Sequence, residues 1–242
     1  MQTFLNLSVK QAKGIDEPIF ENAQELFQNA NLLAEHANSY SKATSLLILS
    51  LEETIKAIII KLHSEGLKVY NIDGVQKFVK DHKIRHQIAQ LIETGSGLLE
   101  VYDGWIEAKN KPHKFKKQWL NDITNGLQAA LKFNNTYQRV EKLKKFNDLK
   151  NQGLYTEYRN ELILPKDGVL EKDFNEVKEI VERTFNFYRL VRIIYNSNSN
   201  NSPSNQRNEY IKIHLKTFVD DVLNEFSFRT SSSENFKKSK SN

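Results

Sequence analysis

The chain has 242 residues, of which 39% are hydrophobic and 27% charged. A chain of this length buries one sizeable core, or one core with a small appendage. It contains no cysteine, which excludes disulfides, thiolate nucleophiles and cysteine-ligated metal sites. The net charge is +5, yet eleven Lys and Arg stand against four Asp and Glu between Trp105 and Lys150. The positive charge is therefore concentrated in one stretch of the chain.

Apolar residues recur at helical spacing along most of the sequence, and Gly and Pro are few, which predicts an all-α fold. The first helix is expected to begin at Asp16-Glu17-Pro18, an acidic entry with an early proline, and to end near Tyr40. Ser41 can cap a second helix, whose broad apolar surface from Ala43 to Leu62 predicts the central, most buried helix.

A more polar helix is expected after the Asp73-Gly74 turn, ending at Gly95-Ser96-Gly97. Further helices are predicted around residues 98–106, 119–131 and 140–149, followed by an irregular segment from Leu154 to Gly168. The strongest amphipathic pattern runs from Glu171 to Tyr195. The predicted organisation is a helical bundle over residues 1–195, a flexible Asn/Ser-rich linker over 196–206, and a C-terminal helix with a disordered basic tail over 207–242.

Targeting and membrane signals are absent from the pattern. The amino-terminal residues lack the charged-then-apolar layout of a signal peptide, and no run of 18 apolar residues is present. We therefore expect a cytoplasmic protein that does not associate with a membrane.

Charged residues interrupt the apolar second helix at Glu52, Glu53 and Lys56. Glu52 or Glu53 can form an ion pair with Lys56 across one turn, at a bundle or dimer interface. The alternative is that these residues form a polar cluster lining a functional site.

The segment His82-Lys83-Ile84-Arg85-His86 places two histidines four residues apart, on one helical face. Such a pair can ligate a metal, but no carboxylates repeat at matching spacing apart from the Glu52-Glu53 pair, so no metal is expected. The alternatives are a solvated helix surface or a cationic, titratable face. In the second case His82 or His86 transfers a proton, and Lys83 and Arg85 hold a phosphate.

Three elements in this order resemble the abortive infection protein V (AbiV) family of bacterial phage-defence proteins. The first runs from Asn22-Ala23 through Leu33-Ala34, Ala43 and Leu49 to Glu52-Glu53-Thr54-Ile55-Lys56. The second is His82-Lys83-Ile84-Arg85. The third is Lys150-Asn151-Gln152-Gly153-Leu154-Tyr155, followed by Pro165. This family is similar to the HEPN superfamily, whose members are helical bundles that commonly dimerise and often act as metal-independent ribonucleases. The resemblance implies a HEPN-like bundle, a homodimer, no cofactor, RNA as the substrate or partner, inhibition of translation, and a phage-encoded activator protein.

The ribonuclease signature of that superfamily is Arg, four to six residues, then His, frequently with Asn after the Arg. The expected position here contains Lys150-Asn151 and Tyr155 instead. Lys lacks the bidentate geometry of Arg, and a phenol is a poor base at neutral pH. The predicted catalytic set is therefore a composite of Lys150, Asn151, Tyr155, His82 and Lys83, supported by Glu52, Glu53, Lys56, Arg85 and His86. In this set Tyr155 can stack on a base, or His82 or His86 can supply the imidazole that the signature histidine would otherwise provide.

A literal match to the signature occurs at Arg207, Asn208 and His214, and provides an alternative catalytic set. The other interpretation of that segment is an amphipathic helix that docks on the bundle or on a second subunit. For RNA binding, the best surface candidates are the lysines of one basic loop: Lys109, Lys111, Lys114, Lys116 and Lys117. A non-catalytic module that binds RNA or a phage protein is the alternative to an enzyme.

Overall fold

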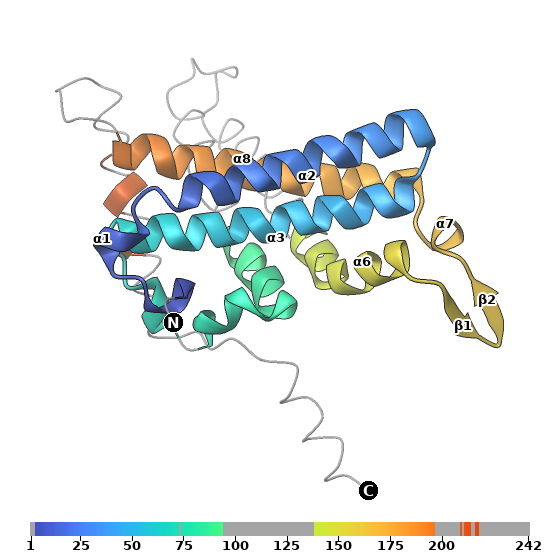
Figure 1. The fold of residues 1–242 in the computed structure, drawn as a ribbon, viewed down its shortest axis with the longest axis horizontal. Helices are drawn as coiled ribbons and strands as arrows, with labels where there is room; N and C mark the ends of the chain where they lie inside the picture. The colour runs from blue at the N-terminus through green and yellow to red at the C-terminus, as the bar shows by residue number, and fades with distance from the viewer. Residues whose placement is uncertain are drawn as a thin grey trace, which may run out of the picture.

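The computed structural model describes residues 3–72, 74–93, 138–196, 209, 211–213 and 216–217. In these ranges the fold is an all-α bundle, as the periodicity predicts, and it also contains one small hairpin that the sequence analysis did not predict. Three long helices, α2 (Asp16–Ala37), α3 (Tyr40–Ser64) and α8 (Glu171–Asn196), run side by side along its length (Figure 1). A short amino-terminal segment with η1 (Phe4–Asn6) and α1 (Val9–Ala12) precedes them.

Helix α3 is the centre of the bundle. It packs against α2, α8 and α6 (Phe146–Leu154), and most of its residues are buried on every side. This explains why its sequence is apolar around nearly the whole circumference rather than along one stripe. The prediction of a central second helix is confirmed, and α2 and α8 lie within a few residues of their predicted bounds.

Aromatic packing and a buried hydrogen bond join α2 to α8. The ring of Phe20 contacts those of Phe185 and Tyr188 at centroid distances of 5.0 and 4.2 Å. The Tyr188 hydroxyl donates to the carboxylate of the buried Asp16 over 2.8 Å. The first turn of α2 is thereby fixed to α8, whose residues follow more than 150 positions later.

The segment after α3 differs from the single polar helix that the sequence predicts. It forms two short 3-10 turns, η2 (Val69–Asn71) and η3 (Val75–Val79), and then a separate helix over 82–93. The Asp81 carboxylate accepts the backbone N–H of Lys83 over 2.9 Å and so caps this helix. The cap places His82 in the first helical turn.

The carboxyl-terminal half of the described chain continues with a helix over 138–144, a turn at residue 145 and then α6. The segment predicted to be irregular contains β1 (Glu157–Arg159) and β2 (Glu161–Ile163), which pair antiparallel, and α7 (Pro165–Gly168). This hairpin projects from one end of the bundle (Figure 1).

Candidate functional site

A buried carboxylate on the central helix organises the candidate site. Glu52 is only 2% exposed and pairs with other residues, whereas its neighbour Glu53 forms the i,i+3 ion pair with Lys56. The sequence therefore predicts the intrahelical pair correctly for Glu53 and wrongly for Glu52. A charged group at this depth needs partners, and Glu52 finds them on two other helices.

The helix over 82–93 provides three of the donors. One Glu52 oxygen, Oε2, lies 2.5 Å from His82 Nδ1 and 2.9 Å from Arg85 Nη2. The other oxygen, Oε1, lies 3.2 Å from His86 Nε2. Arg85 also donates from Nη1 to the carbonyls of Phe78 and Val79, at 2.7 and 3.1 Å, which fixes the guanidinium in place.

Helix α6 provides the fourth donor. Lys150 Nζ lies 3.0 Å from Glu52 Oε1, and its side chain is buried. The hydroxyl of Ser45 on α3 donates to the Lys150 carbonyl over 3.0 Å. The helices approach this closely because residue 153 is glycine: a Cβ there would lie 2.3 Å from Ser45 Oγ and 2.4 Å from the carbonyl oxygen of Ser41.

We refer to Glu52, His82, Arg85, His86 and Lys150 as the Glu52 cluster. Burial alone would raise the pKa of Glu52, but the hydrogen bond from His86 and the charges of Arg85, His86 and Lys150 together hold it well below its usual value. Burial lowers the pKa of His86, against the opposing effect of Glu52. The cluster therefore contains an ionised Glu52 with the side chains of Arg85 and Lys150 buried beside it, and burial disfavours the charged form of His86.

His82 is the member of the cluster that reaches the surface, with 46% of its side chain exposed. Its Nδ1 is near both Glu52 and Arg85 Nη2, the latter at 2.7 Å. A carboxylate can only accept, so we assign the Nδ1 proton to the bond with Glu52. Arg85 Nη2 then lies close to His82 Nδ1 because both groups donate to the same Glu52 oxygen, Oε2. In this tautomer Nε2 is the nitrogen of His82 that carries the free lone pair.

The other members of the predicted composite set lie outside the cluster. Asn151 and Lys83 are half-buried, and Tyr155 follows the end of α6 with 63% of its surface exposed. The structure therefore brings together His82 and Lys150, which are 68 positions apart in the sequence, and leaves Tyr155 on the surface. The alternative set of Arg207, Asn208 and His214 lies outside the described residues, as do Lys109, Lys111, Lys114, Lys116 and Lys117.

Sequence reasoning missed a second buried carboxylate. Glu93, the last described residue of the helix that begins at His82, lies 2.5 Å from Arg139 Nε and 3.0 Å from Arg183 Nη2 on α8. Glu52 thus anchors the first turn of this helix and Glu93 the last turn that the structure describes. Neither contact has a local sequence signal, because each joins residues far apart in the chain.

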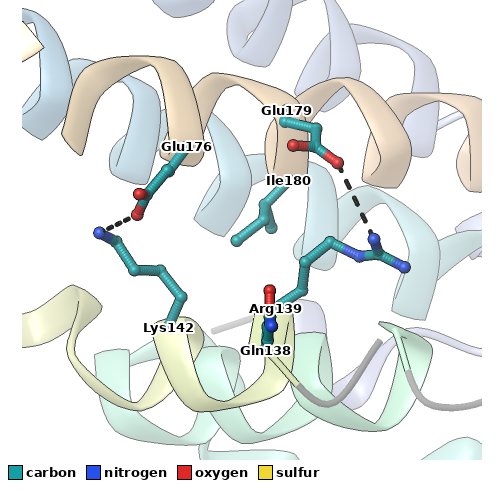
Figure 2. Close-up of a pocket in the computed structure, with 6 residues that line it drawn as sticks. All are labelled: Gln138, Arg139, Lys142, Glu176, Glu179 and Ile180. Atoms are coloured by element: carbon teal, nitrogen blue, oxygen red, sulfur yellow. Dashed lines mark hydrogen bonds and ion pairs between the residues drawn. The ribbon is translucent and has the colours of Figure 1, made fainter. Parts of the chain in front are cut away.

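Beside this second cluster lies a cavity of about 360 Å³. Arg139 and Lys142 from the helix over 138–144 face Glu176 and Glu179 from α8 across it (Figure 2). Opposite charges therefore pair across the cavity, and two basic and two acidic groups line it. Such a lining gives the cavity no strong preference for an anion or a cation.

The described part of the chain offers neither a metal site nor a membrane-spanning helix. No group of three or more His, Asp or Glu is arranged there to hold a metal ion. In the same residues, no helix combines the length and the apolar character needed to cross a bilayer.

The fold and the site define an all-α, HEPN-like bundle. The family model HEPN_AbiV, described as AbiV, matches residues 11–186. This match runs from α1 into α8 and includes every residue of the Glu52 cluster. The chain belongs to the AbiV family, and this membership indicates a role in abortive-infection phage defence. No curated protein and no solved structure matches the chain.

Proposed function

We propose that this AbiV-family protein blocks phage propagation by cleaving RNA without a metal ion, with His82 as the group that moves the proton. The observation that supports this proposal is a half-exposed imidazole whose Nδ1 is held by a buried carboxylate. This arrangement fixes the ring and leaves Nε2 available to a substrate.

The chemistry needs one base and a positive environment. Nε2 of His82 accepts the proton of an RNA 2′-hydroxyl, the O2′–P bond forms, and the P–O5′ bond breaks. The proton then passes to the departing 5′ oxygen, which leaves a 2′,3′-cyclic phosphate. Arg85 and Lys150 carry two positive charges against one negative charge on Glu52, so the cluster has an excess of positive charge beneath the imidazole that favours a phosphate there.

Substrate binding is assigned, in our proposal, to members of the predicted set that lie outside the Glu52 cluster. Tyr155 is exposed and offers a ring on which an unpaired base can stack. Lys83 and Asn151 offer donors for the phosphate and sugar, and the lysines of residues 109–117, which lie outside the described residues, are further proposed RNA contacts. Single-stranded or looped RNA is the substrate class that such a surface suits.

The test is to incubate the purified protein with total RNA in excess EDTA. We expect cleavage by the wild type, and a loss of at least about 100-fold in His82→Ala, because general acid–base catalysis contributes at least that factor. The matched control is His36→Ala, which removes an exposed histidine from α2 and should leave the rate unchanged. Tyr155→Phe retains the ring and should also cleave, whereas Tyr155→Ala should raise KM. Equal rates in His82→Ala and the wild type would refute the role of His82.

A second candidate function is a non-catalytic module that inhibits translation by binding RNA or a phage protein. The observation that favours it is the burial of Lys150 and Arg85, whose cationic groups are held by Glu52 and so cannot directly contact a phosphate. RNA binding that weakens steeply with salt, without any cleavage product, would support this function over the enzyme.

A further inference from the structure

A second cavity, of about 530 Å³, lies at the end of the bundle where α3 and α8 end (Figure 1). Its walls come from three parts of the chain: residues 65–68 after α3, Tyr195 in the last turn of α8, and Lys212, Ile213 and Lys216 beyond it. Glu65 follows Glu52 by 13 positions, which is about 20 Å along a helix axis. The cavity is therefore separate from the Glu52 cluster, and its volume is typical of small-molecule sites.

The lining carries more positive charge than the protein itself neutralises. Among the described residues, three lysines and one carboxylate line the cavity: Lys68, Lys212, Lys216 and Glu65. Glu65 pairs with Lys61 over 2.6 Å, and Lys212 pairs with Glu209 over 2.8 Å. The amino groups of Lys68 and Lys216 form no ion pair with any described residue. Two uncompensated positive charges therefore face the cavity, which favours an anion with about two negative charges.

The end of α3 beside the cavity is partly neutralised. The last carbonyls of a helix carry a partial negative charge when they have no partner. Here Gly66 has a φ of 83°, and the chain turns back on the helix. The backbone N–H groups of Gly66 and Leu67 then donate to the carbonyls of His63 and Leu62 over 3.0 and 3.1 Å. These bonds reduce the repulsion that an anion would otherwise meet at this wall.

The rest of the lining is apolar and includes an aromatic ring. Leu67, Ile213 and the ring of Tyr195 contribute it, and Ile213 is 62% exposed. Burial and the carboxylates of Glu65 and Glu209 raise the pKa of the Tyr195 phenol. The hydroxyl therefore keeps its proton at neutral pH and adds no negative charge to the cavity. A flat apolar group can pack on a ring in this position.

We propose that this cavity binds a small phosphomonoester with a flat apolar body, such as an aryl phosphate. A phosphomonoester carries close to two negative charges at neutral pH, which matches Lys68 and Lys216, and lysine commonly binds phosphate. Sugar phosphates and nucleotides fit less well because their hydroxyl and amino groups need acceptors. The one carboxylate in the described lining, that of Glu65, is already paired with Lys61.

Isothermal titration calorimetry of the full chain with phenyl phosphate tests this proposal. We expect a Kd below about 1 mM, which is reasonable for a ligand of this size. Phenol, inorganic phosphate and adenosine 5′-monophosphate should each bind at least about tenfold more weakly. Phenol lacks the charge, inorganic phosphate lacks the ring, and the nucleotide brings polar groups that find no partner.

Variants locate the binding in this cavity. Lys68→Gln combined with Lys216→Gln should weaken the binding of phenyl phosphate by at least about tenfold. The matched control combines Lys42→Gln with Lys166→Gln at the other end of the bundle (Figure 1) and should leave binding unchanged. All four lysines are exposed, so both double variants should fold. His82→Ala should bind phenyl phosphate as the wild type does, which separates this result from the outcome of the RNA cleavage assay.

Four results would each overturn the proposal. The first is a wild type that does not bind phenyl phosphate. The second is phenol, inorganic phosphate or adenosine 5′-monophosphate binding as tightly as phenyl phosphate. The third is equal affinity in the two double variants, and the fourth is loss of binding in His82→Ala, which would place the ligand at the Glu52 cluster instead.

Discussion

Removing the charge of Glu52 is the perturbation that tests the buried cluster most severely. Glu52→Gln retains the size of the side chain and one oxygen acceptor, but it leaves Arg85 and Lys150 without their carboxylate. Both cations are buried and cannot recover the lost interaction from water. Breaking a buried pair by removing one partner costs about 3–5 kcal/mol, and here two cations share the partner that is lost.

The adjacent residue provides a matched control. Glu53→Gln removes the same charge from the same helix, but Glu53 pairs with Lys56 within one turn, and both side chains retain contact with solvent. Such pairs contribute below about 1 kcal/mol. Urea denaturation followed by far-UV circular dichroism at pH 7 measures both variants. A free energy of unfolding for Glu52→Gln within about 1 kcal/mol of that for Glu53→Gln would refute the account of the cluster.

The same pair of proteins predicts a pH dependence. The pKa of Glu52 is lower in the folded state than its ordinary value of 4.5, so between the two values the unfolded state binds the proton more readily. The contribution of this carboxylate is therefore fully present above pH 4.5 and is lost as the pH falls toward the folded pKa. The difference in stability between the wild type and Glu52→Gln should narrow in that acid range.

Three further predictions concern the cluster and the helices that support it. Burial lowers the pKa of His86 from 6.5, so the wild type should lose stability as the pH falls below 6.5. The urea midpoint of the wild type should therefore be lower at pH 5.5 than at pH 7.5. In His86→Gln the two midpoints should differ less. Gly153→Ala should lower the free energy of unfolding, measured by thermal denaturation, by about 1–3 kcal/mol, because the new Cβ meets Ser45 and Ser41. In the control Gly168→Ala no atom lies within 4 Å of the new Cβ, and the free energy of unfolding should change by less than about 0.5 kcal/mol. Equal effects of the two substitutions would contradict the close approach of α6 to α3. Tyr188→Phe leaves the buried Asp16 without its hydrogen-bond donor and should lower the free energy of unfolding, measured by urea denaturation, by about 1–3 kcal/mol. Adding Asp16→Asn should restore part of this loss in the double variant. Full additivity of the two substitutions would show that the hydrogen bond contributes nothing.

The long helices could be predicted from the sequence because each buries a face along its whole length. The apolar spacing from Asp16 and from Glu171 gives the start of α2 and α8, and the broad apolar surface of α3 predicts its central position. The hairpin could not be predicted in this way. Its strands have three residues each, which is too short for an alternating pattern to be distinguished from irregular chain.

The site was predictable in its residue types but not in its pairing. Glu52, His82, Arg85 and Lys150 are all identifiable as charged or titratable residues in unusual positions, and the resemblance to the AbiV family adds their order. The partners of Glu52 are 30 to 98 positions away, however, whereas spacing along one helix identifies partners only three or four positions away. This is why the local pattern favours Lys56 as a partner for either glutamate. Ser45 and Gly153, which position Lys150, have roles that depend on a contact between two helices.

In the proposed function, His82, held by Glu52, abstracts the proton of an RNA 2′-hydroxyl. The most direct measurement compares the cleavage rate of a single-stranded RNA in excess EDTA with that of the same strand carrying a 2′-deoxy nucleotide at the cleaved position. We expect the wild type to cleave the RNA to a 2′,3′-cyclic phosphate and to leave the deoxy-substituted strand uncleaved. The cleavage rate of His82→Ala should be lower than that of the wild type by at least about 100-fold. Cutting of the deoxy strand, or a His82→Ala rate equal to that of the wild type, would contradict the proposed function.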